Sequence, residues 1–315
     1  MIHFMRLKWV GLTMSTALLI GGFYYTMNVL DGFREGIDFA GGIKIEMDAG
    51  EKIDIESVRN TLNDIDIDAT VQMAGKDVEN LFKIEIGGQD EEKMQAEAEK
   101  NDTKLIKAGY TANSIDYVKY QLVNVLAGGD KDVIVFLNDT QVGPTFGDYL
   151  RDMSYRLLLI TLVLITIYIT FRFRFVFAVG AMVALLHDLA MTMVVIGVLQ
   201  IPLSTPIIAA LLTILGYSIN DTIVIFDRIR ENQRGSEKIN FEGQVNRSIN
   251  QSISRTVITS VTTLIAIASV YVLAQDTLQA MALVLIYGII IGTYSSSFIA
   301  SPVVVIWERY VNKVR

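Results

Sequence analysis

Six apolar stretches of about 20 residues each constrain the fold more than any other feature of the sequence. A helix that rises 1.5 Å per residue needs about 20 apolar residues to cross the roughly 30 Å hydrocarbon core of a bilayer. The chain of 315 residues is 51% hydrophobic with a mean hydropathy of +0.41, as expected if much of it lies in lipid. The predicted spans are 10–30, 153–171, 175–199, 203–226, 256–274 and 278–307.

Lys and Arg lie almost entirely at alternate ends of these spans. The segment 31–149 has 25 acidic and 12 basic residues, a net charge of −13, whereas the rest of the chain carries +6. Because connections rich in Lys and Arg stay in the cytoplasm, the pattern predicts cytoplasmic termini and an extracytoplasmic acidic segment. Arg151 and Arg156, at the outer end of the second span, are exceptions that we interpret as interfacial. The cytoplasmic basic residues are Arg6, Lys8, Arg172, Arg174, Arg228, Arg230, Arg234, Lys238, Arg247, Arg309, Lys313 and Arg315.

The predicted fold is a polytopic α-helical membrane protein with six transmembrane helices and an extracytoplasmic α+β domain. Residues 1–30 form the cytoplasmic N-terminus and the first helix, 31–150 the extracytoplasmic domain, and 151–315 a five-helix bundle. A cytoplasmic loop with one short surface helix is expected at 229–250. The first span exceeds the 7–15 apolar residues of a signal-peptide core, so we interpret it as a retained anchor.

The acidic segment alternates strand and helix patterns. Strands are expected at 42–49, 67–73, 81–86 and 132–137, and helices at 54–64, 90–108 and 115–126. This order predicts a small sheet with helices on one face, of the ferredoxin-like type. The helix at 90–107 is polar on nearly all sides, and we expect it to be mobile or to pack only lightly.

The fourth span has one polar face, which includes Asp221. An ionised Asp deep in a bilayer costs at least about 2.5–3.5 kcal/mol, so such a residue normally faces a bundle interior and has a task. Asp221 is therefore a candidate proton-binding group, and the alternative is a structural polar contact between helices. Asp227 lies nearer the cytoplasmic interface, where a structural role is favoured. The polar face consists of Thr213, Gly216, Tyr217, Asn220, Asp221, Asp227, Arg228 and Glu231.

Two further places in the spans carry ionisable groups. Arg255, where the fifth span enters the membrane, is a candidate counter-ion for Asp221 that stays protonated, and the alternative is snorkelling to lipid headgroups. His187 and Asp188 lie near the middle of the third span. They are a candidate second proton relay or partner site, or else a hydrogen-bonded core pair. With two histidines and no cysteine in the chain, we expect no metal site.

Small residues form one face of the last span. Gly288, Gly292, Ser295 and Ser296 have the spacing that lets helix backbones approach closely, so this face is predicted to pack against a helix of the same chain or of another subunit. No phosphate-binding Gly-x-x-x-x-Gly-Lys loop occurs, which argues against ATP as an energy source.

The sequence resembles the SecD and SecF family of export proteins. Residues 36–42, Gly-Ile-Asp-Phe-Ala-Gly-Gly, resemble the signature that follows the first span in that family. Ala40 and Ser297 depart from the residues frequent there, and neither lies at a proposed proton site. Further segments similar to the SecF branch, in the same order, are 142–144, His187-Asp188, 216–221 with Arg228, 254–256 and 294–302.

The resemblance implies a relative of the proton-driven resistance–nodulation–division transporters. Such a chain pairs with a SecD-like protein, so that two six-helix halves form a pseudo-symmetric bundle in the lipid of the bacterial inner membrane. It implies a motor subunit, not an enzyme, that uses the proton gradient and no cofactor to help draw unfolded polypeptides from the SecYEG channel. Asp221 matches the family's proton-responsive aspartate and Arg255 its arginine in the next helix. No nucleic-acid partner is expected.

Two other functions remain open from the sequence. One is an independent proton-coupled exporter of small molecules or lipids, against which stand the six helices and the single outer domain. The other is a non-catalytic scaffold of the translocon, which would tolerate neutral substitutions at Asp221.

Overall fold

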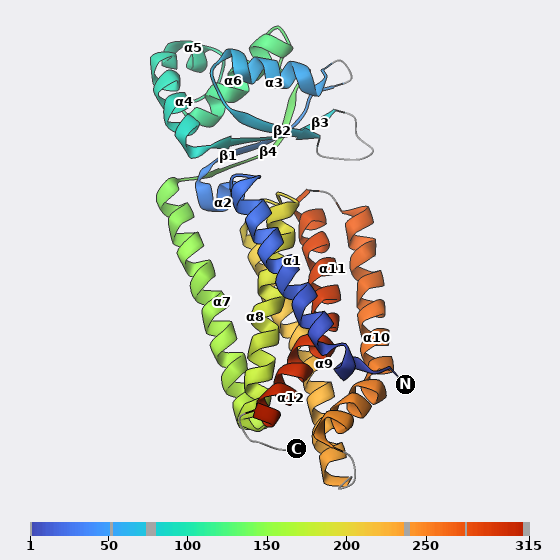
Figure 1. The fold of residues 1–315 in the computed structure, drawn as a ribbon. Helices are drawn as coiled ribbons and strands as arrows, with labels where there is room; N and C mark the ends of the chain where they lie inside the picture. The colour runs from blue at the N-terminus through green and yellow to red at the C-terminus, as the bar shows by residue number, and fades with distance from the viewer. Residues whose placement is uncertain (1, 51–52, 74–79, 236–239, 275, 311–315) are drawn as a thin grey trace. The chain divides into compact units, whose positions relative to one another are not determined.

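The computed structural model describes residues 2–50, 53–73, 80–235, 240–274 and 276–310, and the chain divides into two compact units (Figure 1). One unit comprises Met1–Arg34 and Ser154–Arg315 and contains the long helices. The other comprises Glu35–Met153 and contains the sheet. Each unit has its own hydrophobic core.

The unit Glu35–Met153 has the predicted ferredoxin-like α+β fold. Its four strands form an antiparallel sheet in the order β2-β3-β1-β4, and its main helices follow β1 and β3, giving a βαββαβ order. The elements are α2 (Ile37–Ala40), β1 (Gly42–Asp48), α3 (Ile55–Asp64), β2 (Ala69–Met73), β3 (Leu81–Gly87), α4 (Gly88–Lys100), α5 (Asp102–Lys107), α6 (Ser114–Leu126) and β4 (Val135–Val142).

Strict alternation along the central strands fixes the register of the sheet. Ile43 lies opposite Ile86 and Ile45 opposite Ile84, and all four side chains are fully buried. A slip of one residue would turn this apolar set to the other face, so the burial specifies the pairing. Helices α3, α4 and α6 lie on one face of the sheet (Figure 1).

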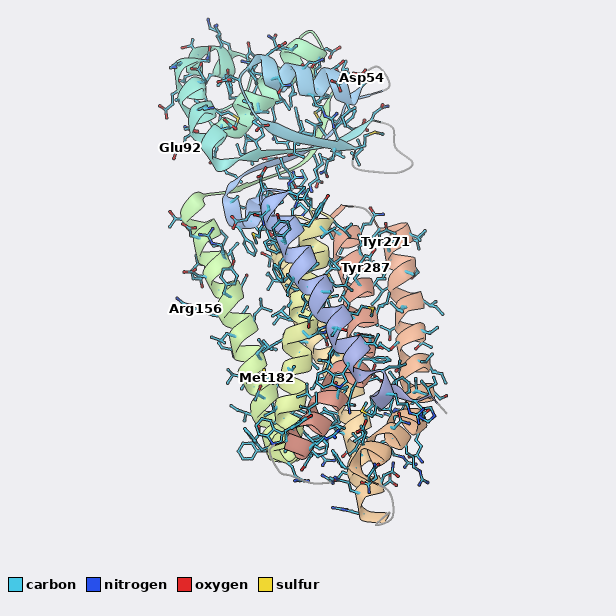
Figure 2. The ribbon with its side chains drawn as sticks, viewed as in Figure 1. Asp54, Glu92, Arg156, Met182, Tyr271 and Tyr287 are labelled. Atoms are coloured by element: carbon cyan, nitrogen blue, oxygen red, sulfur yellow. The ribbon has the colours of Figure 1, made fainter. Side chains whose placement is uncertain are left out.

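Local caps begin the helices of this unit. The Asp54 carboxylate accepts a hydrogen bond from the Ser57 backbone N–H at 2.8 Å, which satisfies a donor that α3 itself cannot pair (Figure 2). Hydrogen bonds from the Ser57 side chain and backbone hold the pKa of Asp54 below its ordinary value. Asn113 caps α6 in the same way, since its side chain accepts from the Asp116 N–H at 2.7 Å.

Gly41 and Gly42 have positive φ angles, which favour glycine. Gly42 has φ +133°, and a Cβ there would lie 2.1 Å from the carbonyl oxygen of Ile86. A Cβ on Gly147 would lie 2.7 Å from the carbonyl oxygen of Phe39. Chain segments therefore approach too closely here for any side chain.

The expectation that the helix at 90–107 packs only lightly is wrong. The segment forms two helices, α4 and α5, that meet at Asn101. Met94, Ala98 and Leu105 are at most 1% exposed and belong to the core of the unit. These few apolar positions lie on the core-facing side of two otherwise polar helices, and their small number concealed the buried face in the sequence.

The last strand lies later than expected. Strand β4 covers Val135–Val142, whereas the sequence predicted 132–137. Its register shifts opposite Glu46 and Met47, and Leu137 has no partner on β1. Four polar residues, 138–141, make up half of this strand, and its position at the sheet edge explains why no apolar alternation marked it.

The other unit confirms the predicted multi-pass membrane fold. Among the described residues, six helical spans are long and apolar enough to cross a bilayer. The last span is composite, because a π-helical turn, η2, joins α11 to α12. The elements are α1 (Lys8–Asn28), α7 (Pro144–Arg172), α8 (Phe175–Val198), α9 (Thr205–Gly235), α10 (Phe241–Leu273), α11 (Asp276–Ser295), η2 (Ser296–Ala300) and α12 (Ser301–Tyr310).

Three spans form the centre of this unit. The apolar windows of α8, α9 and the composite last span are 50%, 50% and 61% buried, against 17%, 17% and 11% for α1, α7 and α10. Helices α7 and α10 lie on opposite sides of α8, α9 and α11 (Figure 1). Arg156 on α7 is exposed and points away from the other helices (Figure 2).

The segment 229–250, expected as a loop with one short surface helix, is largely helical. Helix α9 continues to Gly235 and α10 begins at Phe241, while residues 236–239 lie outside the described part of the chain. The first turns of α10 bury one face that includes Val245 and Ile249. The polar composition of the segment had favoured a loop, whereas packing of this face stabilises a helix.

The N-terminal segment covers that face of α10. A 3-10 turn, η1 (Phe4–Arg6), buries Phe4 and Met5. Ile2 donates its backbone N–H to the Asn250 side chain at 2.8 Å, and Lys8 forms an ion pair with Glu242 at 2.8 Å. The start of α1 is thus fastened to the start of α10.

Neighbouring residues on α5 provide a test of the core of the sheet-containing unit. Leu105→Ala should lower the free energy of unfolding of this unit by about 2–5 kcal/mol, because it leaves a cavity at a fully buried site. Ile106→Ala, at a side chain that is 61% exposed, should change it by less than about 0.5 kcal/mol. Hydrogen exchange of the β1 and β3 amides in the purified full chain measures this opening. Equal effects of the two variants would contradict the described packing of α5.

Candidate functional site

Asp221 lies on the buried side of α9. Its residue is 2% exposed, and its Oδ2 atom has no hydrogen-bond partner among the described residues. Buried polar atoms are almost always paired, because an unpaired one loses its hydration without compensation. An unpartnered carboxylate oxygen within a spanning helix is therefore a position where a proton or a water molecule can bind.

Arg255 on α10 is the charged neighbour of this carboxylate. The two side chains interact electrostatically, and no direct ion pair joins them among the described residues. Arg255 is exposed at the surface of the unit, whereas Asp221 is buried. A guanidinium keeps its positive charge in proteins. The charge of Arg255 therefore acts on Asp221 without changing its own protonation state.

Asp188 on α8 forms a second, fully buried centre. Its Oδ1 lies 3.0 Å from His187 Nδ1, and its Oδ2 accepts a 2.8 Å hydrogen bond from the Ser295 hydroxyl of α11. The Ser218 hydroxyl of α9 donates to the same Oδ2 atom. Three central spans therefore meet at one carboxylate. The Nε2 atom of His187 is buried without a partner among the described residues.

The small residues predicted on the last span lie against α9. A Cβ on Gly288 would lie 2.2 Å from Cδ1 of Ile214, and one on Gly292 would lie 2.9 Å from Cβ of Ser218. At these two positions the small residues of the last span therefore pack against a helix of the same chain. Ser296 begins the π turn, and its hydroxyl donates to the Thr293 carbonyl at 3.0 Å.

Three other predicted site residues of α9, Asn220, Asp227 and Arg228, have surroundings different from those of Asp221. Asn220 is exposed. Asp227 pairs with Arg172 on α7 at 3.3 Å, and Arg228 donates to the Gln251 side chain at 2.8 Å. These partners are at the helix ends where α7, α9 and α10 carry their basic residues, and they hold neighbouring helices together.

Sequence reasoning did not single out Ser218. It placed the polar face of α9 on other residues and gave Ser295 only a packing role, whereas both serines donate hydrogen bonds to Asp188. A signal existed in the spacing, because Ser218 lies three residues before Asp221 and so shares its side of the helix. Among the described residues, no group of three or more His, Cys, Asp or Glu side chains is arranged to hold a metal ion.

Comparison with known families points to protein export. A family model described as "Protein export membrane protein SecD/SecF, C-terminal" matches residues 123–310. Protein translocase subunit SecF of Desulfurispirillum indicum is 36% identical over 315 residues, covering 98% of this chain and 93% of the relative. The SecF subunit of Thermodesulfovibrio yellowstonii is 33% identical over 309 residues, covering 97% and 94%. That of Rickettsia rickettsii is 32% identical over 312 residues, covering 98% and 93%.

Solved structures agree with this family. The crystal structure of SecDF from Thermus thermophilus, described as a translocon-associated membrane protein, superposes with a TM-score of 0.77 at 32% identity. A second crystal structure, of SecDF in a super-membrane-facing form, gives a TM-score of 0.66 at 30% identity. The matches cover 98% and 99% of this chain, and in each case 39% of the SecDF chain, so this chain spans about two fifths of SecDF. The chain belongs to the SecD/SecF family of protein export membrane proteins, within its SecF branch.

Proposed function

We propose that this chain is the SecF-type subunit of a SecD–SecF complex in the bacterial cytoplasmic membrane. In this proposal the complex uses the proton gradient to help draw unfolded polypeptides out of the SecYEG channel. The observation that supports proton coupling is Asp221, which is 2% exposed, has an unpartnered Oδ2 among the described residues and interacts electrostatically with Arg255. The membership of the SecF branch supports the link to export.

The proposed cycle depends on the charge of Asp221. When ionised, the carboxylate is attracted to the guanidinium of Arg255 on α10. When protonated it is neutral, the attraction disappears, and α9 and α10 are free to move apart. A proton drives such a change only if it binds one arrangement of the helices more tightly than the other. Moving one charge through 100 mV supplies about 2.3 kcal/mol, which is enough to bias a two-state equilibrium substantially.

A SecD-like partner follows from polar residues that this chain leaves exposed on its spans. Asn220 on α9 and Arg255 on α10 are both exposed. Lipid offers no hydrogen-bond partner to such a face, so a second helical half is favoured as its cover. The matches cover 39% of the SecDF chains, so those proteins contain further polypeptide, as a chain with a second half would. The description of one SecDF as translocon-associated supports the contact with SecYEG.

The proposed topology has both termini in the cytoplasm and residues 31–150 outside. Because the chain has no cysteine, single cysteines provide clean labels. Ser57→Cys and Arg234→Cys lie at exposed positions of the two units. With an impermeant thiol reagent on intact spheroplasts, we expect the first variant to label and the second to label only after permeabilisation. The reverse pattern would invert the topology.

The proposed partnership predicts that Asn220 lies at the interface with the SecD-like protein. A photo-crosslinking residue introduced at Asn220 should form an adduct with that protein in native membranes, since this face is polar and exposed. Ile160 on α7 is also exposed at 53% but lies on an apolar surface, and it serves as the lipid-facing control. Adducts to lipid alone at both positions would argue for a chain that acts by itself.

Proton coupling at Asp221 predicts a selective defect. Asp221→Asn removes the titrating charge and keeps the shape, so export into inverted vesicles should lose its uncoupler-sensitive component while assembly persists. Asp227→Asn, which weakens a half-exposed pair with Arg172, should be milder because exposed pairs contribute about 0–1 kcal/mol. If Asp221→Asn retains full uncoupler-sensitive export, Asp221 is structural, and His187 and Asp188 become the next candidates for the relay.

A further inference from the structure

The carboxylate of Asp188 joins three central spans. Its residue is completely buried, and it contacts His187 on its own helix, Ser218 on α9 and Ser295 on α11. Both of its oxygens are engaged, whereas Asp221 has an oxygen without a partner among the described residues. The two buried aspartates therefore have different environments, and the family resemblance assigned a role only to Asp221.

Ser218 connects Asp188 to the proposed proton site. It precedes Asp221 by three residues on α9, so the two side chains lie on neighbouring positions of one helix face. The hydrogen bond from the Ser218 hydroxyl to Asp188 holds α9 in one rotation about its axis near these residues. That rotation determines where the Asp221 side chain points. If the residue next to Ser218 took its place against Asp188, α9 would turn by about 100° and shift along its axis by about 1.5 Å.

Ser295 connects the same carboxylate to the π turn of the last span. It is the final residue of α11, and η2 begins at the next residue. The hydroxyl of Ser301, the first residue of α12, donates to the carbonyl of Ser296 at the start of the turn, at 2.9 Å. Single π turns are rare in helices and occur frequently at functional sites. Asp188 thus holds α11 where its helical register changes.

We propose that Asp188 is a positioning residue for Asp221. Its carboxylate accepts hydroxyl hydrogen bonds from α9 and α11, holds these helices in the rotation that directs Asp221 toward Arg255, and carries none of the coupling protons itself. The predicted effect of Asp188 on proton-coupled export rests on the proposed function of Asp221. The effect of Asp188 on the position of Asp221 can be measured without an export assay.

Asn and Leu variants separate hydrogen bonding from charge. Asp188→Asn loses the charge but keeps an oxygen that accepts from both serines, while its NH₂ donates to His187 Nδ1 after a change of tautomer. Asp188→Leu has a similar size and also lacks the charge, but it accepts no hydrogen bond. Any purely electrostatic influence on Asp221 is removed equally in both variants, so a difference between them reports the hydrogen bonds.

The remaining ionisable groups around Asp221 are the same in these two variants. Helices α8, α10 and α11 pack against α9, and both substitutions leave the titratable side chains of these helices unchanged apart from position 188 itself. Among the side chains that the structure describes, the ionisable residues of these three helices are His187, Asp188, Glu242, Arg247, Arg255, Tyr271, Tyr287 and Tyr294.

The experiment measures two quantities in the intact complex in membrane vesicles. The first is the pH dependence of labelling of Asp221 by a hydrophobic carbodiimide, quantified by mass spectrometry. The second is uncoupler-sensitive export. We expect Asp188→Asn to retain coupled export and Asp188→Leu to lose it. The labelling midpoints of Asp221 in these two variants should differ by about half a pH unit or more, a threefold change in proton affinity.

Serine variants provide the second line of the test if Asp188→Leu fails to accumulate. Ser218→Ala with Ser295→Ala removes both hydroxyl donors but keeps each Cβ, including the one that Gly292 approaches, and it should shift the labelling of Asp221. Thr192→Ala is the matched control, because the Thr192 hydroxyl is equally buried but donates only to the Asp188 backbone carbonyl, at 2.7 Å.

Two outcomes overturn the proposal. If Asp188→Asn loses coupling as completely as Asp221→Asn, Asp188 itself carries a proton. If Asp188→Leu, or the double serine variant, matches Asp188→Asn in labelling, the hydrogen bonds do not direct Asp221. Should Asp221→Asn keep full coupling, the proposed function fails, while the labelling comparison still decides whether Asp188 positions Asp221.

Discussion

Hydrocarbon provides no hydrogen-bond partner, and the arrangement of polar side chains in the spans depends on this constraint. Most hydroxyls satisfy it locally, by donating to the carbonyl four residues back, as Thr166, Thr213 and Thr262 do. Asp188 cannot, because a carboxylate has no backbone donor available inside a helix, and it takes its donors from other side chains. Asp221 is also buried, but its Oδ2 has no such donor among the described residues. In the proposed function, this contrast distinguishes the structural carboxylate of Asp188 from the titrating one of Asp221.

The same constraint explains how much of the fold could be predicted from the sequence. A stretch of about 20 apolar residues has few alternatives to a spanning helix, so all six spans were predictable from length and composition. In the sheet-containing unit, β1 and β3 alternate because helices of the same unit cover one face of the sheet. That pattern, with the Asp54 cap, was sufficient to predict a ferredoxin-like order.

The errors arose where tertiary packing outweighs local composition. Helices α4 and α5 are largely polar, and only the packed core reveals that Met94, Ala98 and Leu105 close it. The first turns of α10 are polar too, and their helical state depends on Phe4 and Met5, about 240 residues earlier in the chain. Likewise, the sequence predicted Asp221, Arg255 and Asp188 as individual candidates. It could not show that serines from two other helices converge on Asp188, because that requires knowledge of which helices are neighbours.

The close contact between Gly288 and Ile214 has a mechanical consequence. With no space for even a Cβ between α11 and α9, these helices cannot rotate past one another, and Asp188 ties α8 to both. We therefore expect these three helices to move together. Helix α10 is different, since it is anchored by Ile2 and Lys8 at its first turns and is little buried beyond them. Arg255 lies just past that anchor, and the helix extends about 27 Å farther, to Leu273. Beyond Arg255, α10 is hydrogen-bonded to α9 and α11 through Thr263 and Ser260. In the proposed cycle, α10 turns about its anchored first turns, so that a small change in the separation of Asp221 and Arg255 becomes a larger displacement at the far end of the helix.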